Sequence, residues 1–176
     1  GIEQEEMQQR RKGFLNTNGT IGSLKRDEDE TVTSRNVFAQ ADWRFTDRWA
    51  ASAGLRNTRV SFNSRDFFIA AGNPDDSGRT TFSNTSPVAG ITYRLLPELN
   101  VYASAGRGFE TPTFVELAYR NGGTGLNFAL KPSRSSTVEI GVKGRLADDH
   151  RVSLAYFDPE TQDAILVDTK WGGRST

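Results

Sequence analysis

The sequence has 176 residues, and its 22 Lys and Arg balance its 22 Asp and Glu. A balanced charge offers no field to attract nucleic acid, so we expect no nucleic-acid partner. The sequence has no cysteine, which excludes disulfides and thiolate metal sites. It has 17 Gly and 11 Phe but is only 35% hydrophobic, a composition typical of many short strands with glycine-rich turns.

No apolar run approaches the roughly 20 residues that a membrane-spanning helix requires. A β-barrel stays possible, because each barrel strand is apolar only at alternate positions. No segment near Gly1 resembles a signal peptide, and the chain begins without methionine, as an internal fragment would.

The N-terminal part of the chain is expected to be largely loop. Residues 1–7 alternate weakly and are expected to end an incoming strand, whereas residues 8–33 are polar and contain the turn signal Asn18-Gly19. We expect the charged run at 25–30 to be a solvated loop face. A cation-binding loop, or a loop that bridges charged lipid head groups, is the alternative.

The first clear hairpin is predicted at residues 36–58. Apolar and polar residues alternate on both sides of a tight turn at 46–48. Trp43, Phe45 and Trp49 cluster around that turn, where the aromatic girdle of a membrane barrel would meet the interface. Beyond Arg59 the alternation changes phase, which predicts either a bulge or a strand that has risen above the membrane.

Two further hairpins repeat the pattern of strand, short turn, strand and long loop. The second has its turn at 96–98, the third at 147–150, and long loops are predicted at 64–86 and 109–134. Short turns at one end and long loops at the other are typical of outer-membrane barrels. The predicted inward-facing residues are polar or charged and therefore need water or a polar partner; they are Gln40, Asp42, Arg44, Arg56, Glu139, Lys143 and Arg145.

The stretch at 100–117 combines a strand with the beginning of a long loop. It reads Asn-Val-Tyr-Ala-Ser-Ala-Gly-Arg-Gly-Phe-Glu-Thr-Pro-Thr-Phe-Val-Glu-Leu. Alternation holds as far as Ala105, and glycines and a proline then release the chain from the strand. Similar punctuation follows at 130–132, ahead of a strand at 136–143.

These segments resemble TonB-dependent outer-membrane receptors. The strand and loop at 100–117 match the family's "vYas.grGF..Pt..EL" pattern, and residues 130–143 match its "LkPe.s...E.G.k" return strand, with Ser133 in place of the usual Glu. Two upstream strands, at 37–41 and 53–56, also match. The family-motif residues are Tyr102, Gly106, Arg107, Gly108, Phe109, Pro112, Glu116, Leu117, Pro132, Glu139 and Gly141.

The resemblance implies an all-β fold of antiparallel up-and-down strands in a transmembrane β-barrel, with short periplasmic turns and long extracellular loops. We expect residues 1–176 to hold about six or seven of the roughly 22 strands of such a barrel. The plug domain and the remaining strands would then lie outside this sequence. The implied location is the outer membrane of a Gram-negative cell.

The resemblance also implies uptake of a scarce ligand, most often a ferric siderophore, driven by the TonB complex through the plug. The implied partners are the lipid bilayer, the plug domain, the TonB complex and a small-molecule iron chelate. No bond is made or broken, so we expect neither an enzyme nor a cofactor. The alternatives are a soluble β-sandwich binding or adhesion module and a segment of a passive porin.

Candidate ligand-contacting residues lie on the predicted loops. Aromatic and arginine side chains suit the capture of aromatic, anionic chelates. These candidates are Phe67, Phe68, Arg107, Glu116, Tyr119, Arg120 and Asn121. For Arg107 and Glu116, the favoured interpretation is that they hold the loop in shape. The one histidine, His150, is expected to be a turn residue rather than a catalytic base or a metal ligand.

Overall fold

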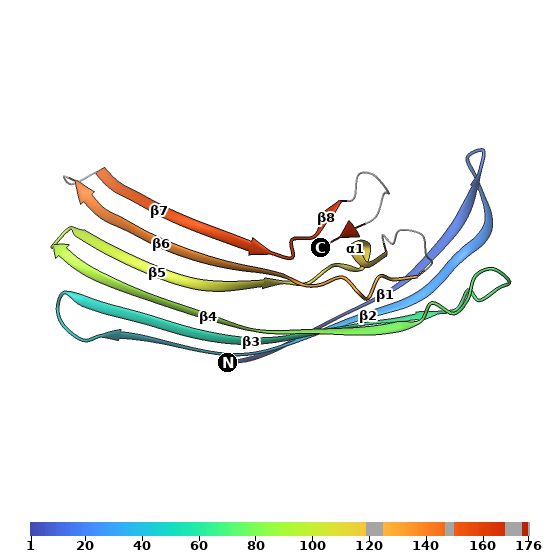
Figure 1. The fold of residues 1–176 in the computed structure, drawn as a ribbon, viewed down its shortest axis with the longest axis horizontal. Helices are drawn as coiled ribbons and strands as arrows, with labels where there is room; N and C mark the ends of the chain where they lie inside the picture. Colours follow the sequence, from blue (N-terminus) through green and yellow to red (C-terminus); the bar gives the residue numbers. More distant parts are fainter. Residues whose placement is uncertain (119–124, 147–149, 168–173, 176) are drawn as a thin grey trace.

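The computed structural model describes residues 1–118, 125–146, 150–167 and 174–175. Seven antiparallel strands pair in sequence order to form one sheet (Figure 1). The strands are β1 (Ile2–Thr17), β2 (Thr20–Arg44), β3 (Trp49–Asp66), β4 (Gly78–Leu96), β5 (Leu99–Glu110), β6 (Ser133–Leu146) and β7 (His150–Gln162). A short helix, α1 (Phe114–Ala118), follows β5, and β8 (Leu166–Val167) pairs with β9 (Arg174–Ser175). The expected all-β fold of about six or seven antiparallel up-and-down strands is confirmed.

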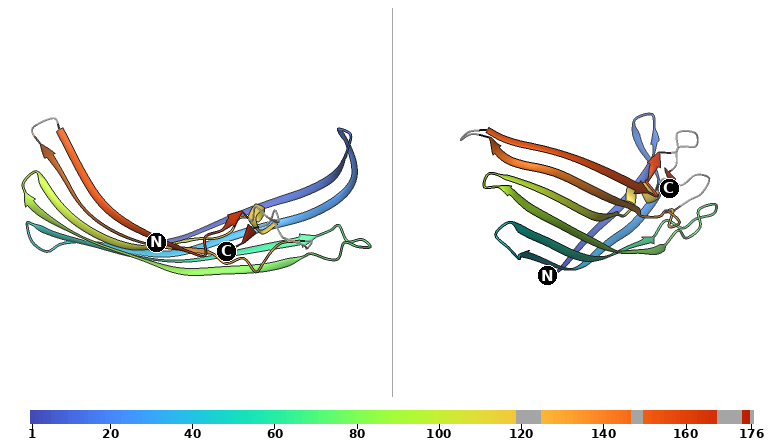
Figure 2. Two further views of the ribbon diagram at one scale, coloured as in Figure 1. Left: turned by 45° about the horizontal axis from the view of Figure 1, so that its top comes forward. Right: turned by 60° about the vertical axis from the view of Figure 1, so that its left-hand side comes forward.

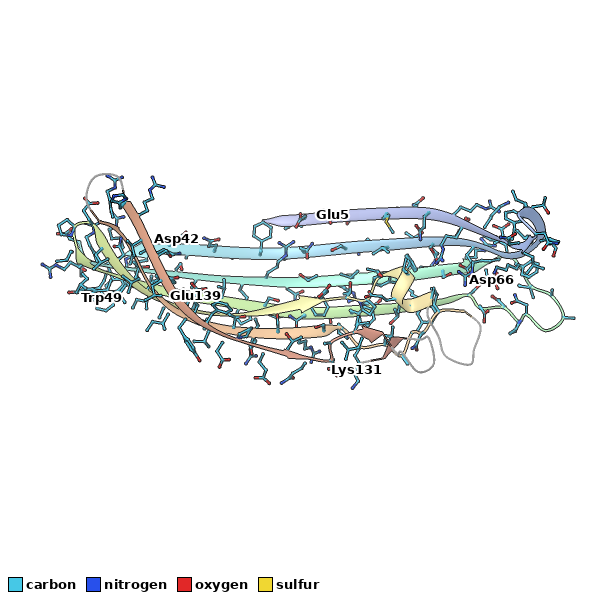
Figure 3. All side chains as sticks on the ribbon, turned by 90° about the horizontal axis from the view of Figure 1, so that it is seen from above. Glu5, Asp42, Trp49, Asp66, Lys131 and Glu139 are labelled. Carbon is cyan, nitrogen blue, oxygen red and sulfur yellow. The ribbon has the colours of Figure 1, made fainter. Side chains whose placement is uncertain are left out.

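The sheet is curved and open on one side, like a trough, and α1 lies over its concave face (Figure 2). Its two ends differ. At the short-turn end, β2 joins β3, β4 joins β5, and β6 joins β7. At the other, the long-loop end, lie the β1–β2 turn and residues 67–77, 111–118 and 125–132. In Figure 3, Trp49 and Asp42 lie toward the short-turn end and Asp66 toward the long-loop end.

An aromatic cluster marks the short-turn end, as predicted. The Trp43 and Phe45 rings lie 5.3 Å apart, those of Phe45 and Trp49 6.3 Å, and those of Trp49 and Tyr93 4.6 Å. The Thr46 Oγ1 accepts hydrogen bonds from the backbone N–H groups of Arg48 and Trp49, which closes the tight turn. Aromatic rings at this depth are typical of a membrane interface.

The convex face carries an apolar belt between the two ends of the sheet. Directly paired residues share a face, and the register aligns Ala41, Ala53, Ala89, Ala105 and Val138 across five strands. Large apolar side chains in this belt are solvent-exposed in the structure: Val37, Trp43, Leu55, Ile91, Val138, Ile140, Leu154 and Tyr156. A face of this kind needs an apolar environment such as lipid.

The same register places the polar residues predicted to face inward on the concave side. Gln40 pairs with Gly54, Asp42 with Ser52, and Glu139 with Ser104. Tyr102 donates a hydrogen bond to Glu139 Oε1, and the Lys143 ammonium lies 4.4 Å from the Tyr102 ring centroid. The predicted assignment of residues to the two faces is confirmed.

The expectation that residues 8–33 form a loop is wrong. They belong to the long β1–β2 hairpin, in which Arg10 pairs with Asp29, Arg11 with Glu28 and Lys12 with Asp27. Asn18 and Gly19 have φ angles of 51° and 86°, as the two central residues of a type I′ turn require. The charged run is not a fully solvated face either: Lys25 is exposed, but Asp27, Glu28 and Glu30 are only 8%, 6% and 1% exposed. Opposite charges facing each other across the hairpin explain why so polar a segment is ordered.

The long loop predicted at 64–86 is also shorter than expected, since β3 continues to Asp66 and β4 begins at Gly78. The register between β2 and β3 and between β3 and β4 runs evenly past Arg59, so the bulge is excluded and the alternative, a strand that extends beyond the membrane, holds. A strand needs about 9–11 residues to cross a bilayer. With 25 residues in β2, the long-loop half of the sheet must project well past the apolar belt.

The hydrophobic core is small and lies on the concave face of this projecting half. It consists of Val60, Phe62, Phe82, Phe114, Leu117, Leu126 and Leu130. Phe62 and Phe114 meet edge to face, with ring centroids 5.2 Å apart, a favoured geometry for aromatic pairs. The change of phase at Val60 thus marks the position on β3 where the inward-facing side chains change from polar to apolar. From this position on, they are covered by the loop after β5.

Among the described residues, no helix is both long enough and apolar enough to cross a membrane.

Candidate functional site

The loop after β5 is held over the concave face by a capped helix. Thr113 and Glu116 form a capping box: Glu116 Oε2 accepts bonds from the Thr113 N–H (2.8 Å) and hydroxyl (3.0 Å), and the Glu116 N–H donates to Thr113 Oγ1 (3.3 Å). Such a box satisfies N–H groups that the first turn of a helix leaves free. Pro112 and Leu117 are almost fully buried beside it. The motif at 109–117 therefore builds a fixed wall.

Two glycines of the motif lie directly against side chains of the neighbouring strands. A Cβ atom on Gly141 would lie 2.6 Å from the Tyr102 hydroxyl and 2.7 Å from its ring, and one on Gly108 would lie 2.3 Å from Ser135 Oγ. Tyr102 therefore packs flat over the Gly141 backbone on the neighbouring strand, which is a known way of covering a strand glycine. This arrangement directs the Tyr102 hydroxyl toward Glu139.

A cavity of about 450 Å³ opens on the concave face at the long-loop end. The β1–β2 hairpin forms one wall, the loop at 67–77 forms another, and α1 with Gly125 closes the third side. Its lining residues are Arg11, Lys12, Gly13, Lys25, Arg26, Glu28, Asp66, Phe68, Asn73, Asp76, Ala118 and Gly125. Of the charged residues among them, four are basic and three are acidic.

Ion pairs within the hairpin fix the charged side chains of this cavity. Arg11 Nη1 lies 3.2 Å from Glu30 Oε1, and Arg26 Nε lies 3.3 Å from Glu28 Oε1. Asp66 is held by backbone N–H groups, since Phe68 N donates to its Oδ1 at 2.8 Å and Asp76 N to its Oδ2 at 3.2 Å. The wall is therefore organised before any ligand arrives, which lowers the entropy cost of binding.

Glu28 is the least satisfied group of the wall. Its Oε2 atom is buried without a hydrogen-bond partner. Burial raises the pKa of Glu28 above its ordinary value of 4.5, against the lowering effect of Arg26 and with a further raising effect of Glu30. In contrast, the Arg10 guanidinium hydrogen-bonds Asp27 and lowers its pKa below 3.8.

These two shifts predict opposite effects of pH on the hairpin. The pKa of Glu28 is higher in the folded hairpin than in the unfolded chain. Its contribution to the stability of the hairpin is therefore complete below pH 4.5 and is lost as pH rises through the pKa of the folded state. We therefore expect Glu28→Gln to strengthen the hairpin at neutral pH. For Asp27, stability is present above 3.8 and is lost as pH falls through its folded pKa, so Asp27→Asn should weaken the hairpin at neutral pH.

Hydrogen exchange of the hairpin amides in the full-length protein, corrected for intrinsic rates, measures both effects between about pH 4 and pH 8. Slower exchange in Glu28→Gln and faster exchange in Asp27→Asn at neutral pH are expected. Equal shifts of the two variants in one direction would contradict the assignment.

The structure separates the predicted ligand-contacting residues. Phe68 lines the cavity. Phe67 stacks instead between two arginines, with the Arg10 and Arg65 guanidinium carbons 5.5 and 5.0 Å from its ring centroid. Arg107 lies on the convex face, in alternation with Ala105, and Glu116 caps α1 as the loop-shaping interpretation proposed. Tyr119, Arg120 and Asn121 lie outside the described residues.

Sequence analysis missed the hairpin half of this cavity. Arg11, Lys12, Lys25, Arg26 and Glu28 were all assigned to a loop. A signal for them was present, because a basic run at 10–12 and an acidic run at 27–30 flank Asn18-Gly19, and such a dipeptide between complementary segments indicates a hairpin. No group of three metal-ligating side chains gathers within the described ranges.

Comparison with known proteins identifies relatives along nearly the whole chain. A family model described as "TonB dependent receptor-like, beta-barrel" matches residues 4–175. The chain is 24% identical over 133 residues to a probable TonB-dependent receptor, BfrD, of Bordetella pertussis, which covers 74% of this chain and 18% of that protein. It is 39% identical over 70 residues to the vitamin B12 transporter BtuB of Photobacterium profundum, covering 40% of this chain and 11% of that protein.

Solved structures share the fold. The copper transporter OprC aligns with a TM-score of 0.66 at 16% identity, over 93% of this chain and 27% of that one. The ferric yersiniabactin uptake receptor FyuA of Yersinia pestis aligns with a TM-score of 0.64 at 20% identity, over 94% of this chain and 26% of that one. The chain thus spans only a fraction of each of these proteins.

Proposed function

Because this chain belongs to the TonB-dependent receptor-like β-barrel family, we propose that it is one segment of a larger receptor that imports a scarce ligand. The segment lies in the outer membrane, with its short turns toward the periplasm and its long-loop end outside the cell. In the proposed whole, roughly 22 strands close around a plug domain, and the TonB complex supplies energy through that plug. The proposed activity makes and breaks no covalent bond.

The cavity at the long-loop end is the observation that carries this proposal. It opens inside the barrel wall and at the extracellular end, so a ligand would meet it before reaching the plug. Arg11, Lys12, Lys25 and Arg26 supply positive charge, and Phe68 supplies an aromatic ring. This combination suits an anionic chelate with aromatic or planar groups, and we propose a ferric siderophore or similar iron complex as the ligand.

Uptake by whole cells tests the proposal. A strain that lacks the full-length gene is compared with its parent for accumulation of radioactive ferric iron, presented with a panel of purified siderophores under iron limitation. We expect that uptake of at least one ferric complex is lost in the strain that lacks the gene and also in a strain that lacks TonB. Uptake that needs the gene but persists without TonB would support a passive porin instead.

The same cells should be offered cyanocobalamin and copper. The similarity to BtuB and the fold shared with OprC, described above, make these the best alternative cargoes. Suppose that uptake of cyanocobalamin or copper depends on both the gene and TonB, and that no ferric complex is taken up. The receptor function would then be supported, and the ligand would be that cargo instead of an iron complex.

Two adjacent phenylalanines provide a matched test of the cavity. We expect Phe68→Ala to weaken ligand binding roughly tenfold, because loss of an aromatic contact of about 1.4 kcal/mol corresponds to that factor. Phe67→Ala removes the same atoms from the outside of the wall and should leave binding unchanged. Ligand titration of the two purified full-length variants measures both. Equal effects in the two variants would exclude this cavity as the ligand site.

A further inference from the structure

Arginines lie on the convex face directly beyond the apolar belt. On β2, Arg35 lies two positions from Val37 on the same face, toward the long-loop end. On β5, Arg107 lies two positions from Ala105 in the same direction. On β3, Arg59 pairs directly with Arg35. All three side chains are exposed. We define Arg35, Arg59 and Arg107 as the arginine row.

The row has no internal charge compensation. Arg35 and Arg59 are like charges on directly opposed positions, which destabilises a sheet unless an anion lies nearby. Among the described residues, none of the three forms an ion pair, whereas the arginines of the hairpin above, Arg10 and Arg11, are paired with Asp27 and Glu30. The row therefore leaves positive charge on this outer surface for an external partner.

The end of the row at Arg107 borders a surface cavity. This cavity measures about 400 Å³ and lies between the upper ends of β5, β6 and β7. Arg107, Arg134, Ser135, Ser136, Glu160 and Gln162 line it. The two guanidinium groups and the outward-facing Ser136 can bind an oxyanion there, while the Glu160 carboxylate limits the net positive charge.

The height of the row above the belt identifies the partner. A residue two positions further along a strand lies about 7 Å further along it, which in a barrel strand tilted by roughly 40° is about 5 Å higher. Arg35 and Arg107 therefore lie at the depth of lipid head groups, just above the hydrocarbon. Long arginine side chains at this depth extend toward the interface. Guanidinium groups bind phosphate through paired hydrogen bonds.

We propose that the arginine row binds the phosphate groups of a phosphorylated lipid in the outer leaflet of the membrane. The bound lipid would neutralise Arg35 and Arg59 and fix the height of the barrel in the bilayer. This surface faces away from the cavity that contains Phe68, so it is independent of the ligand and of the uptake reaction.

The test uses the full-length receptor in nanodiscs. The probe is a glycolipid with phosphate groups on its sugars, compared with the same lipid after enzymatic dephosphorylation, and the measurement is the amount retained after titrated detergent washing. Each arginine near an anionic membrane surface contributes a factor of about five in affinity. The triple variant R35Q/R59Q/R107Q is therefore expected to bind the phosphorylated lipid on the order of 100-fold more weakly.

Matched variants keep the test falsifiable. R44Q/R94Q/R145Q removes the same charge from the concave face and should retain the lipid, and R35K/R59K/R107K keeps the charge and should lose only a few-fold. Equal lipid retention by R35Q/R59Q/R107Q and the parent would overturn the proposal, as would equal affinity for the dephosphorylated lipid. Uptake of the ligand is measured in parallel, so failure of the proposed transport function is seen separately.

Discussion

Replacing Leu117 with alanine is expected to release the loop after β5 from the concave face. Leu117 is fully buried against the small core of β3 and β4, and truncation of such a leucine costs about 2–5 kcal/mol. A change of 2 kcal/mol corresponds to roughly 30-fold in an equilibrium constant. Amides of residues 113–118 in the full-length protein should therefore exchange hydrogen at least about 30-fold faster.

Val115→Ala is the control on the same helix. Val115 is 55% exposed, so its truncation should change exchange little. If the two variants behaved alike, the packing of α1 against β3 would not be what holds this loop. A ligand affinity that falls with Leu117→Ala would further link the position of α1 to the cavity that it borders.

An arginine in place of Ala103 is expected to oppose insertion of the barrel. Ala103 lies in the middle of the apolar belt, paired with Ile91 and Ile140, and a lipid-facing arginine at the bilayer midplane costs about 2–4 kcal/mol. Folding of the full-length protein into lipid vesicles, followed by urea titration and heat-modifiable migration on gels, measures this cost.

The neighbouring residue supplies the matched control. Ser104 faces the concave side and pairs with Glu139, so Ser104→Arg places the same side chain in a polar environment and should cost far less. A larger loss from Ser104→Arg than from Ala103→Arg would mean that the lipid-facing and lumen-facing sides have been exchanged.

Strand alternation was sufficient to predict the membrane-spanning half of this fold. Alternating positions such as Ala41 and Asp42 carry a strong contrast between lipid and lumen, so both the strands and their faces could be read from the sequence. The aromatic residues at the turn, Trp43 and Trp49, indicated where the membrane interface lies along the strands. In this half, each residue's environment is set by its own strand position.

The projecting half could not be predicted in the same way, because water surrounds it and its faces are set by distant partners. Glu30 looks like a solvated residue, but in the folded hairpin it is covered by Gln9 and Arg11. Val60 and Phe62 look out of phase until Phe114, Leu117, Leu126 and Leu130 pack with them. The cavity combines residues from 11 to 125, and no local pattern reports such a combination.

The predicted site residues illustrate the same division. Phe67 and Phe68 are adjacent and chemically identical, yet only Phe68 reaches the cavity, because alternation near the end of β3 turns its neighbour outward. Arg107 belongs to a strand whose outward positions were already visible in the sequence, and its convex placement could have been predicted from the alternation with Ala105. Its contribution is then to the membrane surface rather than to the lumen.

Accessibility of two engineered cysteines on intact cells tests the central claim, that the cavity opens to the outside. The described chain is free of native cysteine, so Lys25→Cys beside the cavity and Asp47→Cys in the short turn are introduced singly into the full-length receptor, freed of other reactive cysteines. A membrane-impermeant maleimide should label Lys25→Cys on intact cells, and Asp47→Cys only after the outer membrane is permeabilised. The reverse pattern would place the cavity in the periplasm and contradict the receptor account.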